Sequence, residues 1–157
     1  MPGRGRETEI RRLLIDGRNV QGALADRDRG ARSGTGARAA GIGPLPTGAL
    51  IARVLAAVTP DAVTELLLDG FPSGGVVGRV GPRFRVEYTK GRTADQRIAD
   101  LVEAAAAELG PIGVDGVLVV SDDRGVGEQA RRHGARVVGT HWLTSRMRRG
   151  PSIGRPR

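Results

Sequence analysis

The stretch VDGVLVVSDDRGVGEQARRHGARVVG, residues Val114 to Gly139, carries the clearest fold signal in this chain of 157 residues. It begins with Val114 to Val120, a nearly continuous aliphatic run that is typical of strands buried on both faces in parallel sheets. Gly125 to His133 then predicts a helix, and the short run Ala135 to Gly139 predicts another strand. Strand, helix and strand in succession form the building unit of α/β proteins.

The rest of the chain repeats this alternation. Arg11 to Ile15 and Ala62 to Leu68 predict aliphatic strands, and the alternating run Arg83 to Tyr88 predicts a third. Helices are predicted for Thr47 to Val58, opened by Thr47, and for His141 to Met147. Together with the opening stretch, these segments predict a three-layer α/β/α sandwich around a mostly parallel five-stranded sheet.

A longer helix precedes the opening stretch. Thr93 begins T-A-D-Q, a capping-box pattern in which Gln96 stands three residues further on. The helical run that follows stops at Gly110 and Pro111. One face of this helix is apolar, and it comprises Ile98, Leu101, Val102 and Ala105.

Two glycine-rich segments separate these elements. The first, residues 21–46, is rich in Gly, Arg and Asp and is longer than most connections in a compact domain. It is either a short helix followed by disorder or a flap that contacts substrate. The second, Phe71 to Pro82, is predicted to be a loop.

The composition fits one globular domain. A chain of this length with 39% hydrophobic residues is long enough for a real core. We expect a domain over residues 11–147, between a flexible N-terminus, 1–10, and a basic C-terminal tail, 148–157. The absence of cysteine excludes disulfides and thiolate sites, and no apolar run approaches the length of a membrane span or a signal peptide. We therefore expect a cytoplasmic protein without a membrane partner.

The charge points to a polyanionic partner. The formal net charge is +8, and Lys90 is the single lysine among 25 basic residues. Arginine binds phosphate through its planar fork, so nucleic acid is the expected partner. The C-terminal arginines either follow a phosphate backbone or are simply solvated: Arg146, Arg148, Arg149, Arg155 and Arg157. Trp142, one tyrosine and two phenylalanines offer little surface for base stacking, which favours phosphate and shape contacts.

Carboxylates stand where an open α/β sheet gathers its functional groups. Asp16, Asp69 and Asp122 each end or directly follow an apolar run, and Asp95 lies in the first turn of the capped helix. Strands that end on an aspartate present it at the carboxyl edge of the sheet, where doubly wound folds bind ligands. Clustered carboxylates at such an edge are typical of sites for hard divalent cations.

Three motifs resemble a known family. The segments LLIDGRNV, YTKGRTADQRI and VLVVSDDRGVGEQARRHGARVVG look like the NYN domain of the PIN-like nuclease superfamily, especially its YacP-like branch, from about Leu13 to Leu143. The D-G-x-N motif is matched by Asp16, Gly17 and Asn19, the T-x-D motif by Thr93 and Asp95, and the S-D-D motif by Ser121, Asp122 and Asp123.

The resemblance implies a metal-dependent endoribonuclease with the PIN-like strand order 3-2-1-4-5. In that order Asp16 and Asp122 face each other at the switch point and Asp95 reaches the same pocket. These three acids are the expected catalytic residues, and with Asp123 they are the expected ligands of Mg²⁺ or Mn²⁺. Asp69 is expected at the periphery of the pocket.

Six further residues are expected to contact or orient the RNA. Asn19 is expected to brace the Asp16 loop or touch a phosphate, and Ser121 to orient a ligand. The predicted phosphate contacts are Arg18, Lys90, Arg92 and Arg124, with a solvated side chain as the alternative for Lys90.

Each acid also has a structural interpretation. Asp95 suits the helix macrodipole, Asp122 or Asp123 can cap the next helix, and Asp16 can be a turn residue. The functional alternatives are a catalytically silent RNA-binding module of the same fold or a PIN-type toxin with an acidic partner. DNA as the substrate and a homodimer also remain open.

Overall fold

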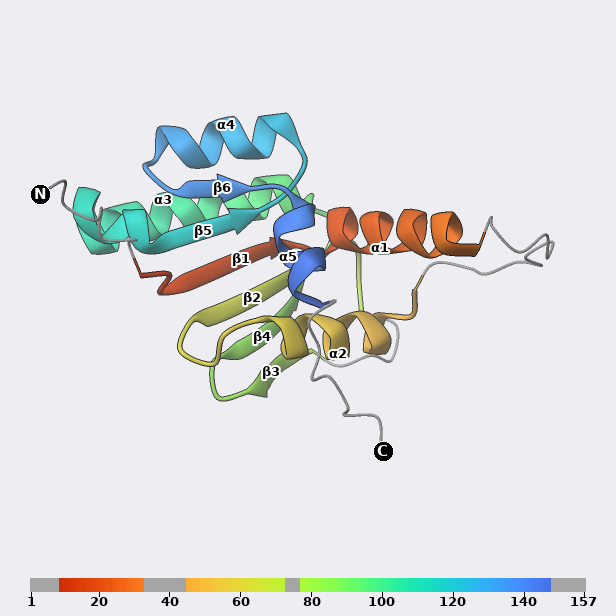
Figure 1. Ribbon diagram of the computed structural model, residues 1–157. Coiled ribbons are helices and arrows are strands. Elements are labelled where there is room, and N and C mark those ends of the chain that lie inside the picture. Colours follow the sequence, from red (N-terminus) through yellow and green to blue (C-terminus); the bar gives the residue numbers. More distant parts are fainter. Residues whose placement is uncertain (1–8, 33–44, 73–76, 148–157) are drawn as a thin grey trace, which may run out of the picture.

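The computed structural model describes residues 9–32, 45–72 and 77–147. Its centre is a six-stranded sheet in the order β3-β4-β2-β1-β5-β6 (Figure 1). All neighbouring strands are parallel except β3, which runs antiparallel to β4. The strands are β1 (Arg12–Asp16), β2 (Val63–Leu68), β3 (Gly78–Gly81), β4 (Phe84–Tyr88), β5 (Val117–Val120) and β6 (Arg136–Val138).

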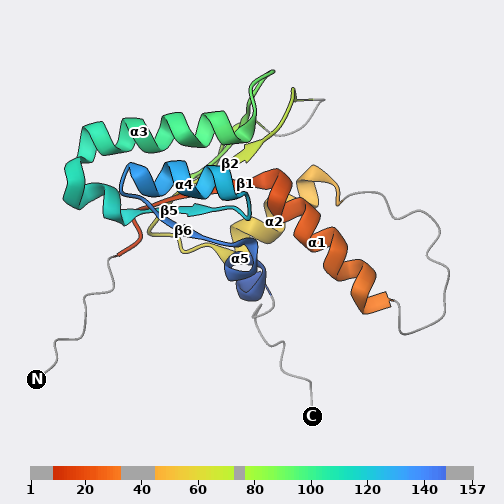
Figure 2. The ribbon, with the colours of Figure 1, turned by 90° about the horizontal axis from the view of Figure 1, so that it is seen from above.

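Helices cover both faces of this sheet, so the predicted three-layer sandwich is confirmed. α3 and α4 pack on one face, while α1, α2 and α5 pack on the other (Figures 1 and 2). The helices are α1 (Gly17–Arg32), α2 (Thr47–Ala57), α3 (Ala94–Gly113), α4 (Arg124–Arg132) and α5 (Thr140–Met147), with a short 3-10 helix, η1 (Val114–Gly116), before β5. Within the described ranges, no helix is both long and apolar enough to span a membrane.

The predicted strand order is confirmed for the five strands expected from the sequence. They lie in the order β4-β2-β1-β5-β6, which is the predicted order 3-2-1-4-5. The sheet has one strand more, because β3 forms within the segment predicted as a loop. Its sequence, GRVG, has little strand propensity, and its pairing with Val86 and Arg85 of β4 is what makes it a strand.

Residues 21–32 are helical, because α1 continues to Arg32, which agrees with the short helix expected as one of the two alternatives for this segment. Among the α1 residues whose burial is described, the buried hydrophobic side chains are Val20 and Leu24, four residues apart. An apolar face this narrow among glycine, arginine and aspartate is a weak helical signal. Residues 33–44 of the predicted loop, residues 1–8 and the basic tail 148–157 lie outside the described residues.

The core has two parts, one on each face of the sheet. Alternate residues of β1 face opposite ways, so Leu13 and Ile15 pack toward α1 and α2, while Leu14 packs toward α3. Each fully buried aliphatic side chain of this kind contributes roughly 1.5–3 kcal/mol. Packing on both faces holds the strands in place, and it therefore positions the residues at their carboxyl ends.

The start of α3 is held by the predicted capping box. The Thr93 hydroxyl accepts a hydrogen bond from the Gln96 amide at 3.2 Å, and the Thr93 amide donates to the Gln96 side chain at 3.2 Å. The predicted end at Gly110 is a kink, where φ is 71° and the chain continues through Pro111 to Gly113. The cap therefore fixes Asp95, one residue into the helix, relative to the sheet.

Candidate functional site

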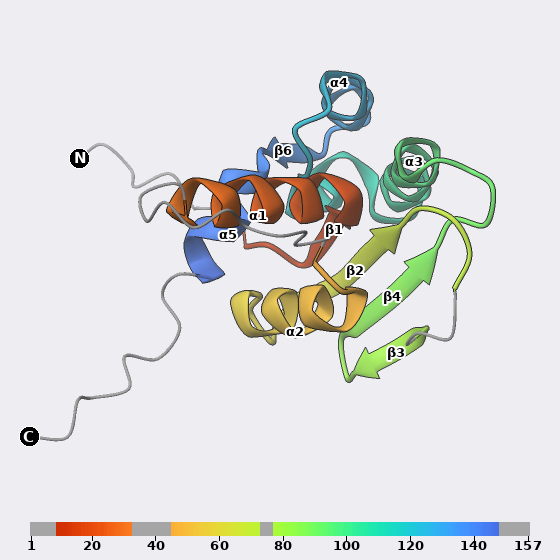
Figure 3. The same cartoon turned by 90° about the vertical axis from the view of Figure 1, so that its right-hand side faces the viewer.

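The candidate site lies at the carboxyl edge of the sheet, which faces the viewer in Figure 3. β1 lies between β2 and β5, and all three strands run parallel. The chain leaves β1 toward β2 on one side and returns to β5 on the other, so the switch point of the sheet lies beside β1. The three strand ends and the start of α3 supply the acids of the site.

Asp16 is the last residue of β1 and is only 1% exposed. One carboxylate oxygen accepts a hydrogen bond from the Asn19 amide at 3.4 Å, and the other accepts from the Ser121 hydroxyl at 3.1 Å. Gly17 follows because a Cβ there would lie 2.6 Å from the Leu67 carbonyl oxygen. The D-G pair thus lets α1 begin against the end of β2, with Asp16 facing the site.

Asn19 and Ser121 join the first and last motifs. The side-chain oxygen of Asn19 accepts a hydrogen bond from the Asp122 amide at 2.9 Å. The Ser121 hydroxyl, besides donating to Asp16, accepts from the Asp123 amide at 3.1 Å. These bonds hold the loop after β5 against the start of α1. Asn19 therefore braces this edge, which is one of the two roles expected for it.

Asp69 and Asp95 bring the ends of β2 and α3 together. Asp69 follows β2, and its carboxylate accepts a hydrogen bond from the Ala94 amide at 2.9 Å. Ala94 is the first residue of α3, so this bond fixes the position of Asp95, the next residue. Asp69 is thus tied to the start of α3, and its peripheral place in a binding pocket stays a prediction.

The charges of these acids act on one another. Burial raises the pKa of Asp16, the hydrogen bonds from Asn19 and Ser121 lower it, and the charges of Asp95 and Asp69 raise it further. Desolvation likewise raises the pKa of Asp95, helped by the charges of Asp123 and Asp69. We call Asp16, Asp69, Asp95 and Asp123 the acid cluster, because their negative charges raise the pKa of one another's carboxyl groups at Asp16 and Asp95.

Asp122 is engaged elsewhere. Its two carboxylate oxygens accept hydrogen bonds from the Thr140 amide at 2.9 Å and the Thr140 hydroxyl at 2.5 Å. Gly139 leaves room for this contact, since a Cβ there would lie 2.8 Å from the carboxylate. The Asp122 side chain anchors the start of α5 and is not one of the acids that raise the pKa of Asp16 or Asp95. Its role as a metal ligand stays a prediction.

Asp123 takes part in two interactions. Its carboxylate accepts a hydrogen bond from the Val126 amide at 3.1 Å and so caps α4, as the structural interpretation predicted. Its charge also acts on Asp95 across the site. Capping by one oxygen leaves the rest of the carboxylate available to a ligand.

The predicted phosphate contacts surround the cluster unevenly. Arg18 lies closest, with its guanidinium 3.6 Å from the Asp69 carboxylate, and its charge lowers the pKa of Asp95. Arg92 forms an ion pair with Asp100 on α3 at 2.5 Å. Lys90 and Arg124 are exposed, the former in the loop before α3 and the latter at the first residue of α4.

The donor set fits a hard cation in its chemistry. Carboxylate and hydroxyl oxygens are what Mg²⁺ and Mn²⁺ prefer, and sulfur and imidazole are absent from the acid cluster. Over residues 9–32, 45–72 and 77–147, no three His, Cys, Asp or Glu side chains are arranged closely enough to hold a metal ion as they stand. A bound cation would have to draw the carboxylates of the cluster together.

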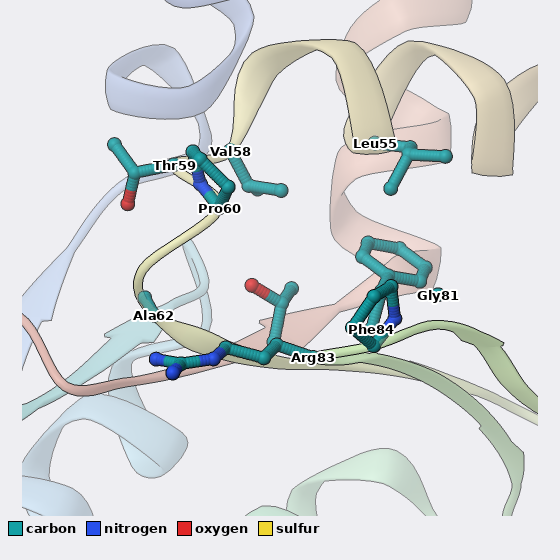
Figure 4. A pocket seen from close by; sticks show the side chains of 10 residues that line it. Leu55, Val58, Thr59, Pro60, Ala62, Gly81, Arg83 and Phe84 are labelled. Carbon is teal, nitrogen blue, oxygen red and sulfur yellow. The ribbon is translucent and has the colours of Figure 1, made fainter.

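A separate hollow of about 270 Å³ lies at the opposite edge of the sheet (Figure 4). It is lined mainly by apolar side chains from the end of α2 and the starts of β2 and β4, among them Leu55, Val58 and Phe84. None of the residues that line it is an Asp or a Glu. The hollow therefore offers no carboxylate ligand for a cation, unlike the acid cluster.

Solved structures of one protein share this fold. The Bacillus subtilis protein Rae1 (YacP), as a tryptophan-to-leucine mutant, is 24% identical, with a TM-score of 0.58 over 88% of this chain and 75% of that chain. A second structure of Rae1 (YacP) is 22% identical, with a TM-score of 0.54 over 87% of this chain and 73% of that chain. The sequence matches no protein family profile and no curated protein. The likeness confirms the fold expected from the YacP-like resemblance.

Proposed function

We propose that this protein is an endoribonuclease that hydrolyses RNA phosphodiester bonds at the acid cluster with the help of Mg²⁺ or Mn²⁺. The observation that carries the proposal is that four acids, from the end of β1, the loop after β2, the start of α3 and the loop after β5, lie at one edge and act on one another through their charges. Burial and, to a smaller extent, the like charges of their neighbours raise the pKa of Asp16 and Asp95, and pKa shifts of this kind concentrate at functional sites.

Two independent comparisons support this proposal. The motifs D-G-x-N, T-x-D and S-D-D, which are far apart in the sequence, supply Asp16, Asp95 and Asp123 to the cluster. The solved structures with the same fold carry the name YacP, which is also the branch that these motifs resemble. The net charge of +8 adds a reason for a polyanionic substrate.

Asp16, Asp69, Asp95 and Asp123 would hold the cation, and Asp122 would support them by anchoring α5. When bound, the cation supplies charge compensation on the scissile phosphate and a water of lowered pKa. The protein's own groups prepare the site: Asn19 and Ser121 orient the Asp16 carboxylate, and Asp69 holds the start of α3.

Positive side chains would hold the RNA across this edge. Arg18 lies at the cluster. Lys90, in the loop before α3, and Arg124, the first residue of α4, are both exposed. Arginine binds a phosphate through two parallel hydrogen bonds, and lysine binds it as a compact charge. Such contacts position the backbone without selecting a base, so the proposed activity requires a further element for substrate choice.

The test is cleavage of a labelled RNA that contains single-stranded and hairpin parts, with Mg²⁺, Mn²⁺ or EDTA. We expect cleavage with metal only, and a loss of about 10²–10³-fold in Asp16→Asn and in Asp95→Asn, as removal of several kcal/mol of transition-state stabilisation predicts. Asp61→Asn is the matched control, because Asp61 is an exposed aspartate before β2 at the opposite edge.

The outcomes separate the alternatives. Cleavage that persists in EDTA or in the Asp16→Asn, Asp95→Asn double variant contradicts the proposed site. RNA binding without cleavage, unchanged in the double variant, supports the silent RNA-binding module instead. A DNA strand of the same sequence, assayed in parallel, shows whether the 2′-hydroxyl is required.

A further inference from the structure

Two loops form a ridge beside the acid cluster. The ridge comprises residues 68–72, from the last residue of β2 to Pro72, and residues 89–92, which follow β4. The Thr89 amide donates to the Leu68 carbonyl and the Lys90 amide to the Gly70 carbonyl, each at 2.9 Å. The two loops thus stay paired beyond the last strand residues, and Figure 2 shows them projecting from the sheet next to the start of α3.

Phe71, on this ridge, is the most exposed aromatic residue of the chain. Its exposed fraction is 68%, whereas Phe84 is buried and Tyr88 and Trp142 pack against the core. An exposed aromatic ring offers a flat apolar face on which a nucleic-acid base can stack. The ring of Phe71 is therefore available to a ligand bound at the carboxyl edge.

Lys90, on the other loop of the ridge, has an unusual backbone conformation. Its φ is 53°, and it is the only described residue other than glycine with a positive φ. This conformation costs a lysine of order 1 kcal/mol, and such residues concentrate at functional sites. The bond from its amide to Gly70 fixes the single lysine of the chain next to the residue that precedes Phe71.

The ridge is continuous with the acid cluster. Asp69 belongs to both, and it is tied to α3 through the Ala94 amide at 2.9 Å. Phe71 follows it by two residues, so the two Cα atoms are at most about 7 Å apart. A nucleotide next to the scissile phosphate is therefore within reach of the ridge.

We infer that the ridge is a nucleotide subsite in which Phe71 stacks on an unpaired base and Lys90 binds the adjoining phosphate. The inference rests on the proposed function and names its substrate class, RNA with single-stranded segments. A base within a duplex is already stacked between its neighbours, so a side chain can cover the face of an unpaired base only. One exposed ring at the site suffices for one base, which departs from the sequence-based expectation of phosphate and shape contacts.

The first measurement is binding in EDTA, where the RNA stays intact. The probe is a short single-stranded RNA that contains 2-aminopurine, whose fluorescence falls when an aromatic ring stacks on it. We expect Phe71→Ala to weaken binding by about 5- to 150-fold and to abolish the quenching, as loss of one stacked base predicts. Phe71→Trp should restore both. Ile112→Ala is the matched control, because Ile112 is 90% exposed at the far end of α3.

The second measurement is metal-dependent cleavage of single-stranded and fully paired RNA. We expect Phe71→Ala to raise KM for the single strand while kcat changes little, and the wild type to prefer the single strand. Equal binding and quenching in Phe71→Ala and the wild type overturn the inference, and so does a preference for duplex. Quenching that needs Phe71, without cleavage by the wild type, supports the subsite and contradicts the proposed nuclease.

Discussion

The two edges of the sheet, where the parallel strands begin (the amino edge) and where they end (the carboxyl edge), differ in how their charged side chains are paired. At the amino edge, basic side chains have anionic or carbonyl partners: Arg12 with Glu65 Oε1 at 3.3 Å, Arg83 with the Asp61 carbonyl at 2.6 Å and Arg136 with the Asp115 carbonyl at 2.8 Å, while Glu65 Oε2 is buried without a hydrogen-bond partner. At the carboxyl edge, the charges of four acids act on one another, and Arg18 forms an ion pair with one of them, Asp69, at 3.6 Å.

The difference indicates that charged groups at the amino edge contribute to the stability of the fold, whereas those at the carboxyl edge contribute to the proposed activity. Polar groups that are satisfied within the fold lower the free energy of the folded state, and changing them should cost stability. Acids that repel one another raise that free energy, and removing one should stabilise the protein while it abolishes function. Three substitutions test this contrast, and the largest expected effect on stability comes first.

Arg12→Ala should destabilise the protein by about 2 kcal/mol, because it leaves Glu65 without its partner. The Glu65 side chain is only 11% exposed, so its carboxylate cannot regain full hydration. Urea unfolding measures the loss. A double variant, Arg12→Met with Glu65→Leu, should recover most of it. If Arg12→Ala leaves the free energy of unfolding unchanged, the amino edge is not stabilised by its charge pairs and the contrast is lost.

Asp122→Ala should lower the free energy of unfolding by about 1–2 kcal/mol, because both hydrogen bonds to Thr140 at the start of α5 are lost. This result would distinguish Asp122, which anchors α5, from the acids of the acid cluster. Denaturant unfolding and the cleavage assay are needed together. Unchanged stability with abolished cleavage would instead place Asp122 among the metal ligands, as the sequence predicted.

Asp16→Asn should stabilise the metal-free protein at pH 7, with a Tm about 2–4 °C higher, as roughly 1 kcal/mol gives in a domain of this size. The pKa of Asp16 is raised on folding. Its favourable contribution is therefore complete below the unfolded value, near 3.8, and is lost as pH rises through the folded pKa. The gain of the variant over the wild type should shrink as pH falls toward 4.

Thermal unfolding in EDTA at several pH values measures this effect, with Asp61→Asn, a change at an exposed acid outside the cluster, as the control. A lower Tm for Asp16→Asn at pH 7 would mean that the hydrogen bonds from Ser121 and Asn19 outweigh the burial of the charge. The carboxyl edge would then be as well compensated as the amino edge.

The sequence predicted the fold well where strands are aliphatic. Val117 to Val120 and Leu66 to Leu68 lie in aliphatic runs bounded by turn signals, which are typical of buried strands, and the strand order followed from the resemblance. It missed β3, and it left open whether the segment that follows β1 is helical. β3 is a strand because β4 offers it hydrogen bonds, and α1 is a helix although, where its side chains are described, its buried hydrophobic side chains are Val20 and Leu24 alone. Neither reason is visible in the local pattern.

For the site, the sequence by itself determined which residues stand at the carboxyl edge, because aliphatic strands end where aspartates begin. It placed Asp16, Asp95, Asp122 and Asp123 there together. Only the tertiary structure decided how these acids are used. Side-chain direction depends on neighbours distant in the sequence: the Thr140 amide and hydroxyl turn Asp122 toward α5, and the Ala94 amide draws Asp69 to the start of α3. Hydrogen-bond partners of that kind exist only once the strands and helices have packed.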